Sequence, residues 1–315
     1  MTSLSQLLNI KHPIIMAPMF LVTNTKMMVA ASKAGVTGCI PALNFRTLKE
    51  FKTAIQTIKE QSEGAFGVNL IVNKSNFLYK EQLKVCCDIK VDYIITSLGS
   101  PEETIKQAHQ AGIKVFCDVT DLAYAKKVEA LGADAIIAVN KEAGGHAGHI
   151  SYKELIPLLV KECNIPVISA GGVGNYQQMQ EVLALGAIGV SVGSLFIAST
   201  ESDVSEDYKN ACINYGAKDI VFTTKISGSK CTVINTPYLK EIGTEQNFLE
   251  KLLNNNRRLK KWFKAFTFYR GMKKLNKAAF SATYKTLWCA GPTIEYVTAI
   301  NPIAQIVKKL TSNNV

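Results

Sequence analysis

A glycine-rich segment with two histidines is the part of this sequence best suited to chemistry. It reads NKEAGGHAGHIS over residues 140–151 and follows an apolar, β-branched run. Its three glycines disfavour a helix and let the backbone approach a flat ligand closely. The side chain of His146, at the centre, can donate or accept a proton near neutral pH, which suits acid–base catalysis. A lone histidine is more often structural, so the case for His146 depends on where the fold places this loop.

The other three histidines are weaker candidates. His149 could share a metal ion with His146, but the glycines spoil the helical geometry of such a pair and no carboxylate cluster accompanies it. We therefore predict no metal site. His12 precedes the first apolar run, and His109 lies on a predicted helix that ends far from the active face, where residues usually serve stability.

Small residues mark two further places where a ligand could bind. The segment SAGGVGN at 169–175 and the segment VGS at 192–194 each follow an apolar run. A single glycine pair more often makes a tight turn. Here glycines occur at both places where barrel enzymes commonly bind a phosphate, after strands seven and eight. We predict a phosphate site at Gly171, Gly172, Gly193 and Ser194.

Asn69 is a polar residue inside an apolar run, between Val68 and Leu70. A buried amide needs a hydrogen-bond partner. Its partner is predicted to be either a neighbouring strand or the edge of a bound ring.

These candidates are positioned by an alternation of short apolar runs with helical stretches, which is typical of βα units and a parallel sheet. Eight strands predict an α/β fold, a closed (β/α)₈ TIM barrel with a C-terminal helical insertion or cap. An open doubly wound sheet usually has six strands and a dinucleotide-binding glycine pattern after the first, whereas here the first ends in APMF. The predicted strands are Pro13–Met19, Thr37–Pro41, Phe66–Val72, Asp92–Ser97, Lys114–Val119, Asp134–Asn140, Ile165–Ala170 and Ile188–Gly193.

Several helix ends can be read directly. Pro101 is a favoured first-turn residue, and Glu102 and Glu103 follow it. The pairs Ala111-Gly112, Leu131-Gly132 and Leu185-Gly186 close three helices before the next strand. In such a barrel the loop that contains His146 lies at the C-terminal face, which favours a catalytic role.

The alternation fails after about residue 200. An irregular stretch follows, and then a predicted helical region from Thr244 to Met272. We predict a barrel core over residues 1–200 and a C-terminal extension or cap over 201–315 that packs on it within the same domain.

Composition fits a single intracellular enzyme. The chain has 315 residues, 47% of them hydrophobic, which is enough for one barrel. Neither a signal peptide nor a membrane span is predicted. The eight cysteines show no CxxC spacing and are predicted to be reduced, which suits the cytoplasm. The net charge of +11 comes from Lys251 to Ile294, which holds eleven basic residues and no acid.

Five motifs together resemble the nitronate monooxygenase and 2-nitropropane dioxygenase family, whose members are FMN-dependent TIM-barrel enzymes. They are PIIMAPM at 13–19, GVNL at 67–70, EAGGHAG at 142–148, ISAGGV at 168–173 and VGSLF at 192–196. The resemblance runs from about residue 5 to residue 200, with a weaker echo in WCAGPTIEYV at 288–297.

The resemblance implies a cofactor and a reaction. FMN would accept an electron from an alkyl nitronate, and reaction with O₂ would give a carbonyl compound and nitrite. His146 would face the substrate, hold the anionic nitronate and act as a base toward a neutral nitroalkane. The residues implied to bind FMN are Ala17, Pro18, Met19, Asn69, Asp118, Gly145, Gly171, Gly172, Gly193 and Ser194.

Three positions depart from the family pattern. Ser194 stands where threonine is common, which is a conservative change. His149 stands where Arg or Lys often follows the loop, and Asp118 where some members carry a cofactor-facing lysine. The last two changes bear on the charge of the preferred substrate.

Two alternatives stay open at this point. The FMN- and NAD(P)H-dependent enoyl-acyl-carrier-protein reductase shares EAGGH and AGG. APM in the first strand favours the monooxygenase, whereas the basic C-terminal region would suit an acidic acyl carrier protein. A nucleic-acid or membrane-binding module is less favoured, because Leu259, Trp262, Phe263 and Phe266 can form one apolar helix stripe. We expect a monomer or homodimer that acts on a small molecule.

Overall fold

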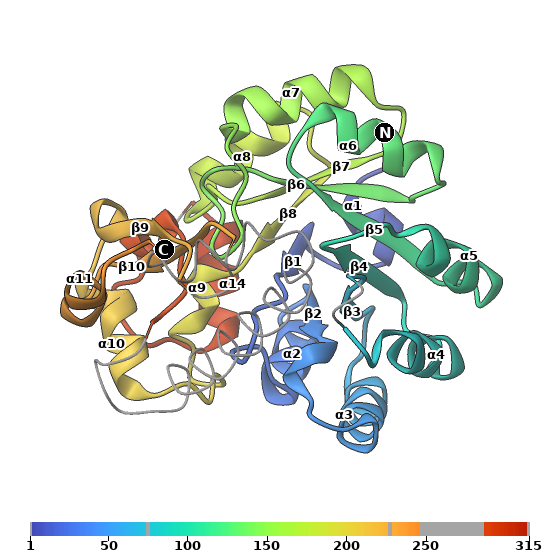
Figure 1. Ribbon diagram of the computed structural model, residues 1–315, viewed down its shortest axis with the longest axis horizontal. Helices are drawn as coiled ribbons and strands as arrows, with labels where there is room; N and C mark the ends of the chain where they lie inside the picture. The colour runs from blue at the N-terminus through green and yellow to red at the C-terminus, as the bar shows by residue number, and fades with distance from the viewer. Residues whose placement is uncertain (1, 74–75, 226–228, 246–286, 314–315) are drawn as a thin grey trace, which may run out of the picture.

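The chain folds around a closed barrel of eight parallel strands in the computed structural model (Figure 1). The structure describes residues 2–73, 76–225, 229–245 and 287–313. The predicted eight-stranded barrel is confirmed. Its strands are β1 (Ile14–Met16), β2 (Thr37–Pro41), β3 (Gly67–Ile71), β4 (Tyr93–Ser97), β5 (Lys114–Val119), β6 (Ala135–Val139), β7 (Val167–Ala170) and β8 (Gly189–Val192).

The strands are short apolar runs that are buried on both faces, as expected when helices cover a parallel sheet. All residues of β1, β2 and β8 are buried. The first strand is shorter than predicted and ends at Met16. Pro18 has no amide hydrogen to continue the ladder, and the amide of Met19 bonds to Thr23 Oγ1 instead, at 3.0 Å.

Helices surround the barrel in the order that the sequence predicts (Figure 1). Those between the strands are α2 (Thr25–Lys33), α3 (Leu48–Gln61), α4 (Tyr79–Ile89), α5 (Glu102–Gln110), α6 (Leu122–Ala130), α7 (Tyr152–Glu162) and α8 (Tyr176–Ala184), with the short η1 (Ala42–Asn44) after β2 and α1 (Leu4–Leu8) before β1. Gly112, Gly132 and Gly186 have φ values of +75°, +90° and +100°. They take the left-handed conformation that ends a helix, as predicted.

The inside of the barrel is filled from its N-terminal end. Tyr93 and Phe116 are fully buried and stack with ring centroids 5.0 Å apart. Ile95, two residues further along β4, and Ile137 on β6 belong to the same apolar cluster. Because alternate residues of a strand point to the same face, Ser97 and Asp118 follow Ile95 and Phe116 on the inward side. The barrel interior therefore changes from apolar to polar at its C-terminal end.

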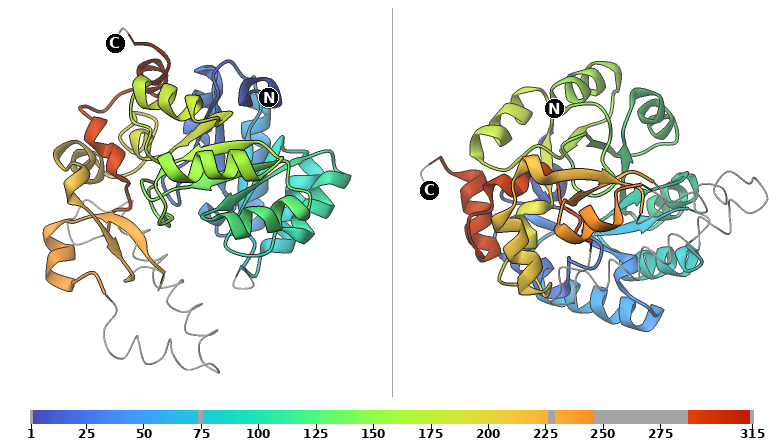
Figure 2. Two further views of the ribbon diagram at one scale, coloured as in Figure 1. Left: turned by 90° about the horizontal axis from the view of Figure 1, so that it is seen from above. Right: turned by 60° about the vertical axis from the view of Figure 1, so that its left-hand side comes forward.

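The chain after β8 forms a second layer beside this end of the barrel (Figure 2). It contains α9 (Ser194–Ile197), α10 (Glu206–Asn214), η2 (Ala217–Asp219), β9 (Ile220–Thr223), β10 (Cys231–Ile234), α11 (Pro237–Ile242), η3 (Pro292–Tyr296) and α14 (Ile303–Thr311). The expectation of an irregular stretch after residue 200 was wrong, since α10 and the β9–β10 hairpin lie there. The strands β9 and β10 have four residues each, which is too short to give a periodic signal.

Two predictions for this region concern residues that the structure does not describe. The helix from Thr244 to Met272 and the stripe Leu259, Trp262, Phe263 and Phe266 lie outside the described residues. The division at residue 200 stays a prediction.

All eight cysteines are free thiols. In the described part of the chain, every helix is too short or too polar to cross a bilayer.

Candidate active site

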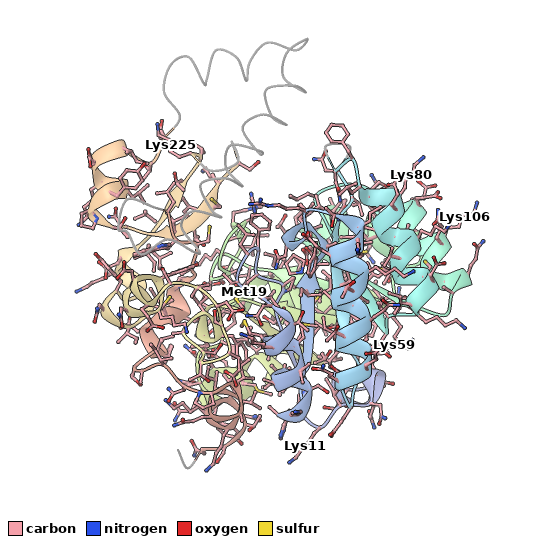
Figure 3. The ribbon with its side chains drawn as sticks, turned by 90° about the horizontal axis from the view of Figure 1, so that it is seen from below. Lys11, Met19, Lys59, Lys80, Lys106 and Lys225 are labelled. Atoms are coloured by element: carbon pink, nitrogen blue, oxygen red, sulfur yellow. The ribbon has the colours of Figure 1, made fainter. Side chains whose placement is uncertain are left out.

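A cavity of about 590 Å³ opens at the C-terminal ends of the barrel strands. Strand ends and the loops after them form its floor, and the C-terminal layer forms one wall. Figure 3 shows Met19 in the middle of the molecule, between the barrel and the C-terminal elements, whereas Lys11, Lys59, Lys80 and Lys106 lie at the periphery. The structure brings all the predicted site residues to this cavity: Ala17, Pro18, Met19, Asn69, Asp118, Gly145, His146, Gly171, Gly172, Gly193 and Ser194.

The loop after β6 is held in shape by Asn140, a fully buried residue that sequence reasoning missed. Its Oδ1 accepts a hydrogen bond from the amide of Glu142 at 3.0 Å, and its Nδ2 donates to the carbonyl of Gly171 at 3.1 Å. Its backbone carbonyl accepts from the amides of Ala143 and Gly148, both at 3.2 Å. One side chain thus ties the histidine loop to the glycine loop after β7. The available signal was a polar residue directly after a buried strand.

The glycines after β7 permit this close packing. Gly171 has φ +107°, and a Cβ there would lie 2.3 Å from Asn140 Oδ1 and 2.4 Å from the amide nitrogen of Ala143. At Gly172 a Cβ would lie 2.7 Å from Tyr152 Cδ1. Both residues therefore have a structural reason to be glycine, a positive φ in a crowded loop, and both also line the cavity. The phosphate site at these residues stays a prediction.

Gly145, next to His146, is different. It has φ +76°, and a Cβ at this position would meet no atom within 4 Å. The space beside it is part of the cavity. The positive φ favours glycine here, and the missing side chain leaves this part of the cavity open.

His146 lines the cavity, and desolvation lowers the pKa of its imidazole below the ordinary value of 6.5. The imidazole is therefore largely neutral at pH 7, with one nitrogen able to donate and the other able to accept a hydrogen bond. His149 does not line the cavity. His109 pairs with Asp134 at 2.9 Å, in keeping with a structural role.

Three polar side chains line another part of the cavity, at the ends of β3, β4 and β5. Asn69 Nδ2 donates to Ser97 Oγ at 2.7 Å, and Ser97 Oγ donates to Asp118 Oδ2 at 2.5 Å. Burial raises the pKa of Asp118 to about 6, and the bond from Ser97 opposes this rise. Ser97 was missed by sequence reasoning, although the alternation along β4 would have placed it above Ile95.

The C-terminal layer is bonded directly to the site. The amide of Thr232 in β10 donates to the carbonyl of Gly145 at 2.7 Å, and the amide of Gly291 donates to Ser194 Oγ at 2.8 Å. Tyr208 stacks on Trp288 at 5.5 Å between ring centroids. These contacts place part of the segment 288–297 at the cavity, since Cys289, Ala290 and Thr293 also line it.

The sequence is similar to one known protein family and to several characterised or named proteins. The family model described as nitronate monooxygenase matches residues 74–313. A "Probable nitronate monooxygenase" of Staphylococcus aureus (strain MSSA476) is 28% identical over 291 residues, covering 76% of this chain and 79% of that protein. A (3aS,4S,5R,7aS)-5-hydroxy-7a-methyl-1-oxo-octahydro-1H-indene-4-carboxyl-CoA dehydrogenase of Rhodococcus jostii (strain RHA1) is 29% identical over 241 residues, covering 76% of this chain and 67% of that protein.

The solved structures show the same fold. FabK from Thermotoga maritima superposes with a TM-score of 0.84 at 28% identity, covering 98% of this chain and 94% of that chain. A nitroalkane oxidase from Streptomyces ansochromogenes has a TM-score of 0.81 at 23% identity, covering 98% and 96% of the two chains. The barrel, the cavity and the match to the family model agree: this chain belongs to the nitronate monooxygenase family and is a flavin-dependent oxidoreductase.

Proposed function

We propose that this protein binds FMN and oxidises alkyl nitronates with O₂ to a carbonyl compound and nitrite. One observation carries the proposal. A neutral histidine, His146, shares a single cavity with the glycine loops after β7 and β8, where barrel enzymes commonly bind phosphate. The cavity thus offers a phosphate site and a proton-transfer group on the same face.

The residues present fit FMN. The open space beside Gly145 leaves room for a flat ring system close to the backbone. On this proposal Ala17, Pro18, Met19 and Asn69 surround the isoalloxazine, while Gly171, Gly172, Gly193 and Ser194 hold the phosphate. Ser194 Oγ already accepts a bond from Gly291, so its own hydrogen remains available to donate to a phosphate oxygen.

FMN, when bound, supplies the electron acceptor and the reactivity with O₂. The chain's own groups supply position and proton transfer. Neutral His146 can donate one N–H to the oxygens of an anionic nitronate. An unprotonated ring nitrogen of His146 can instead take the α-proton of a neutral nitroalkane, because the lowered pKa keeps the imidazole largely neutral at pH 7.

A second candidate is oxidation or reduction of an acyl thioester, as in the enoyl-acyl-carrier-protein reductase. The relative from Rhodococcus jostii is named for a carboxyl-CoA substrate. In addition, the exposed Lys127 lies at the cavity wall, where it could meet an acidic carrier. We rank this candidate second because the matching family model is that of nitronate monooxygenase.

Anaerobic reduction of the bound flavin separates the two candidates. The FMN-loaded protein is mixed in a stopped-flow instrument with propyl-2-nitronate, with NADPH, or with NADPH and an enoyl-CoA, and flavin absorbance is followed. We expect rapid bleaching by the nitronate, and production of nitrite after O₂ is admitted. Rapid bleaching by NADPH with no response to the nitronate would reject the proposed function and support the thioester candidate.

A further inference from the structure

The loop that carries His146 is anchored at its base rather than at its tip. It spans residues 140–151 between β6 and α7 and contains three glycines. At its base the amides of Ala143 and Gly148 both donate to the backbone carbonyl of Asn140, at 3.2 Å. Glycine leaves the backbone conformationally free, and holding it in one conformation costs entropy. The tip beside His146 therefore needs contacts from another part of the chain to keep one position.

Thr232 in β10 supplies such contacts. Its amide donates to the carbonyl of Gly145 at 2.7 Å, and the two residues form an isolated antiparallel bridge. Its hydroxyl lies 3.3 Å from the carbonyl oxygen of Ala143 and 3.4 Å from that of Gly145, so its single hydrogen is shared between them. One residue of the C-terminal layer thus bonds to the residue directly before His146 and to the loop on both sides of Gly144.

The strand β10 is itself fixed, so it can act as an anchor. All four of its residues are buried, and all four pair with β9. On the C-terminal side the amide of Ile234 donates to the carbonyl of Trp288 at 2.9 Å. Trp288 is fully buried and stacks on Tyr208. The loop tip is therefore bonded to a rigid element outside the barrel.

Thr232 does not line the cavity, although Cys231 beside it does. Neighbouring side chains of a strand point to opposite faces, which accounts for this difference. Thr232 can therefore influence a reaction in the cavity only through the loop that it holds. Such an influence can be large, because a displacement of about 1 Å in a catalytic group can cost about 100-fold in rate.

We propose that Thr232 is a positioning residue, which holds the loop tip so that the His146 imidazole stays within reach of the substrate α-proton. This inference rests on the proposed function, in which His146 takes that proton. The C-terminal layer then sets the geometry of a catalytic group that belongs to the barrel.

The test compares two hydroxyl deletions in the same hairpin, made in the full-length, FMN-loaded protein. Thr232→Val removes the shared hydroxyl bond at nearly constant volume, and Thr232→Ser keeps it. Thr223→Val is the matched control. Thr223 in β9 is also buried and outside the cavity, and its hydroxyl donates to a carbonyl, that of Thr244, at 2.8 Å. Circular dichroism verifies folding, and Thr232→Ala takes the place of Thr232→Val if the latter does not fold.

Hydrogen exchange of the loop tests the contact without any substrate. Mass spectrometry follows the peptide that contains residues 142–148. We expect this peptide to exchange about fivefold faster in Thr232→Val than in the wild type, as the loss of one hydrogen bond implies. Thr232→Ser and Thr223→Val should exchange like the wild type. Equal exchange in Thr232→Val and the wild type would overturn the proposal.

Two substrates then separate positioning from a general loss of structure. A neutral nitroalkane requires removal of its α-proton, whereas the nitronate made from it does not. In Thr232→Val we expect kcat/KM for the nitroalkane to fall by about tenfold or more and that for the nitronate to fall less, with recovery in Thr232→Ser. An equal loss for both substrates would indicate a structural role only and would overturn the proposal. If the wild type oxidised neither substrate, the proposed function would be rejected, and loop exchange would still decide whether Thr232 holds the loop.

Discussion

The two sides of the cavity are built from different parts of the chain. The wall after β6, β7 and β8 is mainly backbone, shaped by glycines and held by Asn140, and we call it the backbone side. The wall at the ends of β3, β4 and β5 consists of the side chains of Asn69, Ser97 and Asp118, linked through Ser97, and we call it the side-chain half. The first side therefore depends on glycine backbone and carries His146, whereas the second depends on hydrogen bonds between side chains and carries the Asp118 carboxyl.

The largest expected effect is on the backbone side, at His146. We expect His146→Ala to retain FMN and lower turnover of a neutral nitroalkane, whose α-proton must be removed, by about 10²- to 10⁴-fold, the usual size of a general acid–base contribution. Steady-state nitrite production and the flavin absorbance of the purified variant measure the two quantities. His149→Ala is the matched control, because it removes an exposed histidine from the same loop outside the cavity. Equal turnover in His146→Ala and wild type would remove His146 from the mechanism.

Gly171→Ala tests the packing that shapes the backbone side. The new Cβ would overlap Asn140 and Ala143 at a residue with φ +107°, so something in the loop must shift. We expect a loss of about 2 to 4 kcal/mol in unfolding free energy, from steric overlap and backbone strain together, and weaker FMN binding.

The matched control for Gly171→Ala is Gly112→Ala. Gly112 has φ +75°, but a Cβ there meets no atom within 4 Å. It therefore reports the backbone strain alone, about 1 kcal/mol. Urea denaturation measures both variants. A loss at Gly171 no larger than that at Gly112 would show that the contact with Asn140 does not matter.

In the side-chain half, Asp118 should make the free energy of unfolding depend on pH. The pKa of Asp118 is about 6 in the folded protein and 3.8 for the isolated group, so the folded state holds this proton more tightly. The resulting stabilisation is present below pH 4 and is lost as pH rises through 6. The Asp118→Asn side chain does not titrate, so this variant does not lose that stabilisation as pH rises.

We therefore expect the stability of Asp118→Asn relative to wild type to rise by about 2 kcal/mol between pH 4 and pH 7 in the flavin-free protein. Urea denaturation at a series of pH values measures this difference, and the other titrating groups cancel in it. A difference that does not change with pH would contradict the buried, single-donor environment of Asp118.

The smallest effect is expected where the C-terminal layer meets the backbone side. Ser194→Ala removes the acceptor of the Gly291 amide and should cost about 1 to 2 kcal/mol of stability. Ser194→Thr keeps the hydroxyl and serves as the control. Thermal unfolding measures both. If Ser194→Ala and Ser194→Thr unfold at the same temperature, the bond to Gly291 contributes nothing measurable.

The sequence predicted the backbone side well for a physical reason. Eight apolar runs specify eight strands, and a closed parallel barrel brings the loops after them to one face, so His146 and Gly171 could be placed together without knowledge of any contact. The helix ends at Gly112 and Gly132 were equally predictable, because a left-handed residue favours glycine locally.

The side-chain half was harder to predict because it depends on register. Ser97 and Asp118 meet only when β4 and β5 pair with Thr96 opposite Cys117, and nothing local to either strand specifies that pairing. The bond from Thr232 to Gly145 joins residues far apart in the chain and requires the β9–β10 hairpin, which sequence periodicity did not reveal. Asn140 was overlooked because its role is to accept and donate within loops whose shape it determines.

The most direct test of the central claim is a crystal structure of the protein with FMN bound. The account predicts the phosphate within hydrogen-bond distance of the Gly172 and Gly193 amides and of Ser194 Oγ, with the isoalloxazine ring beside Gly145 and in contact with Met19 and Asn69. A phosphate bound elsewhere, or a ring that contacts neither Gly145 nor Asn69, would contradict it.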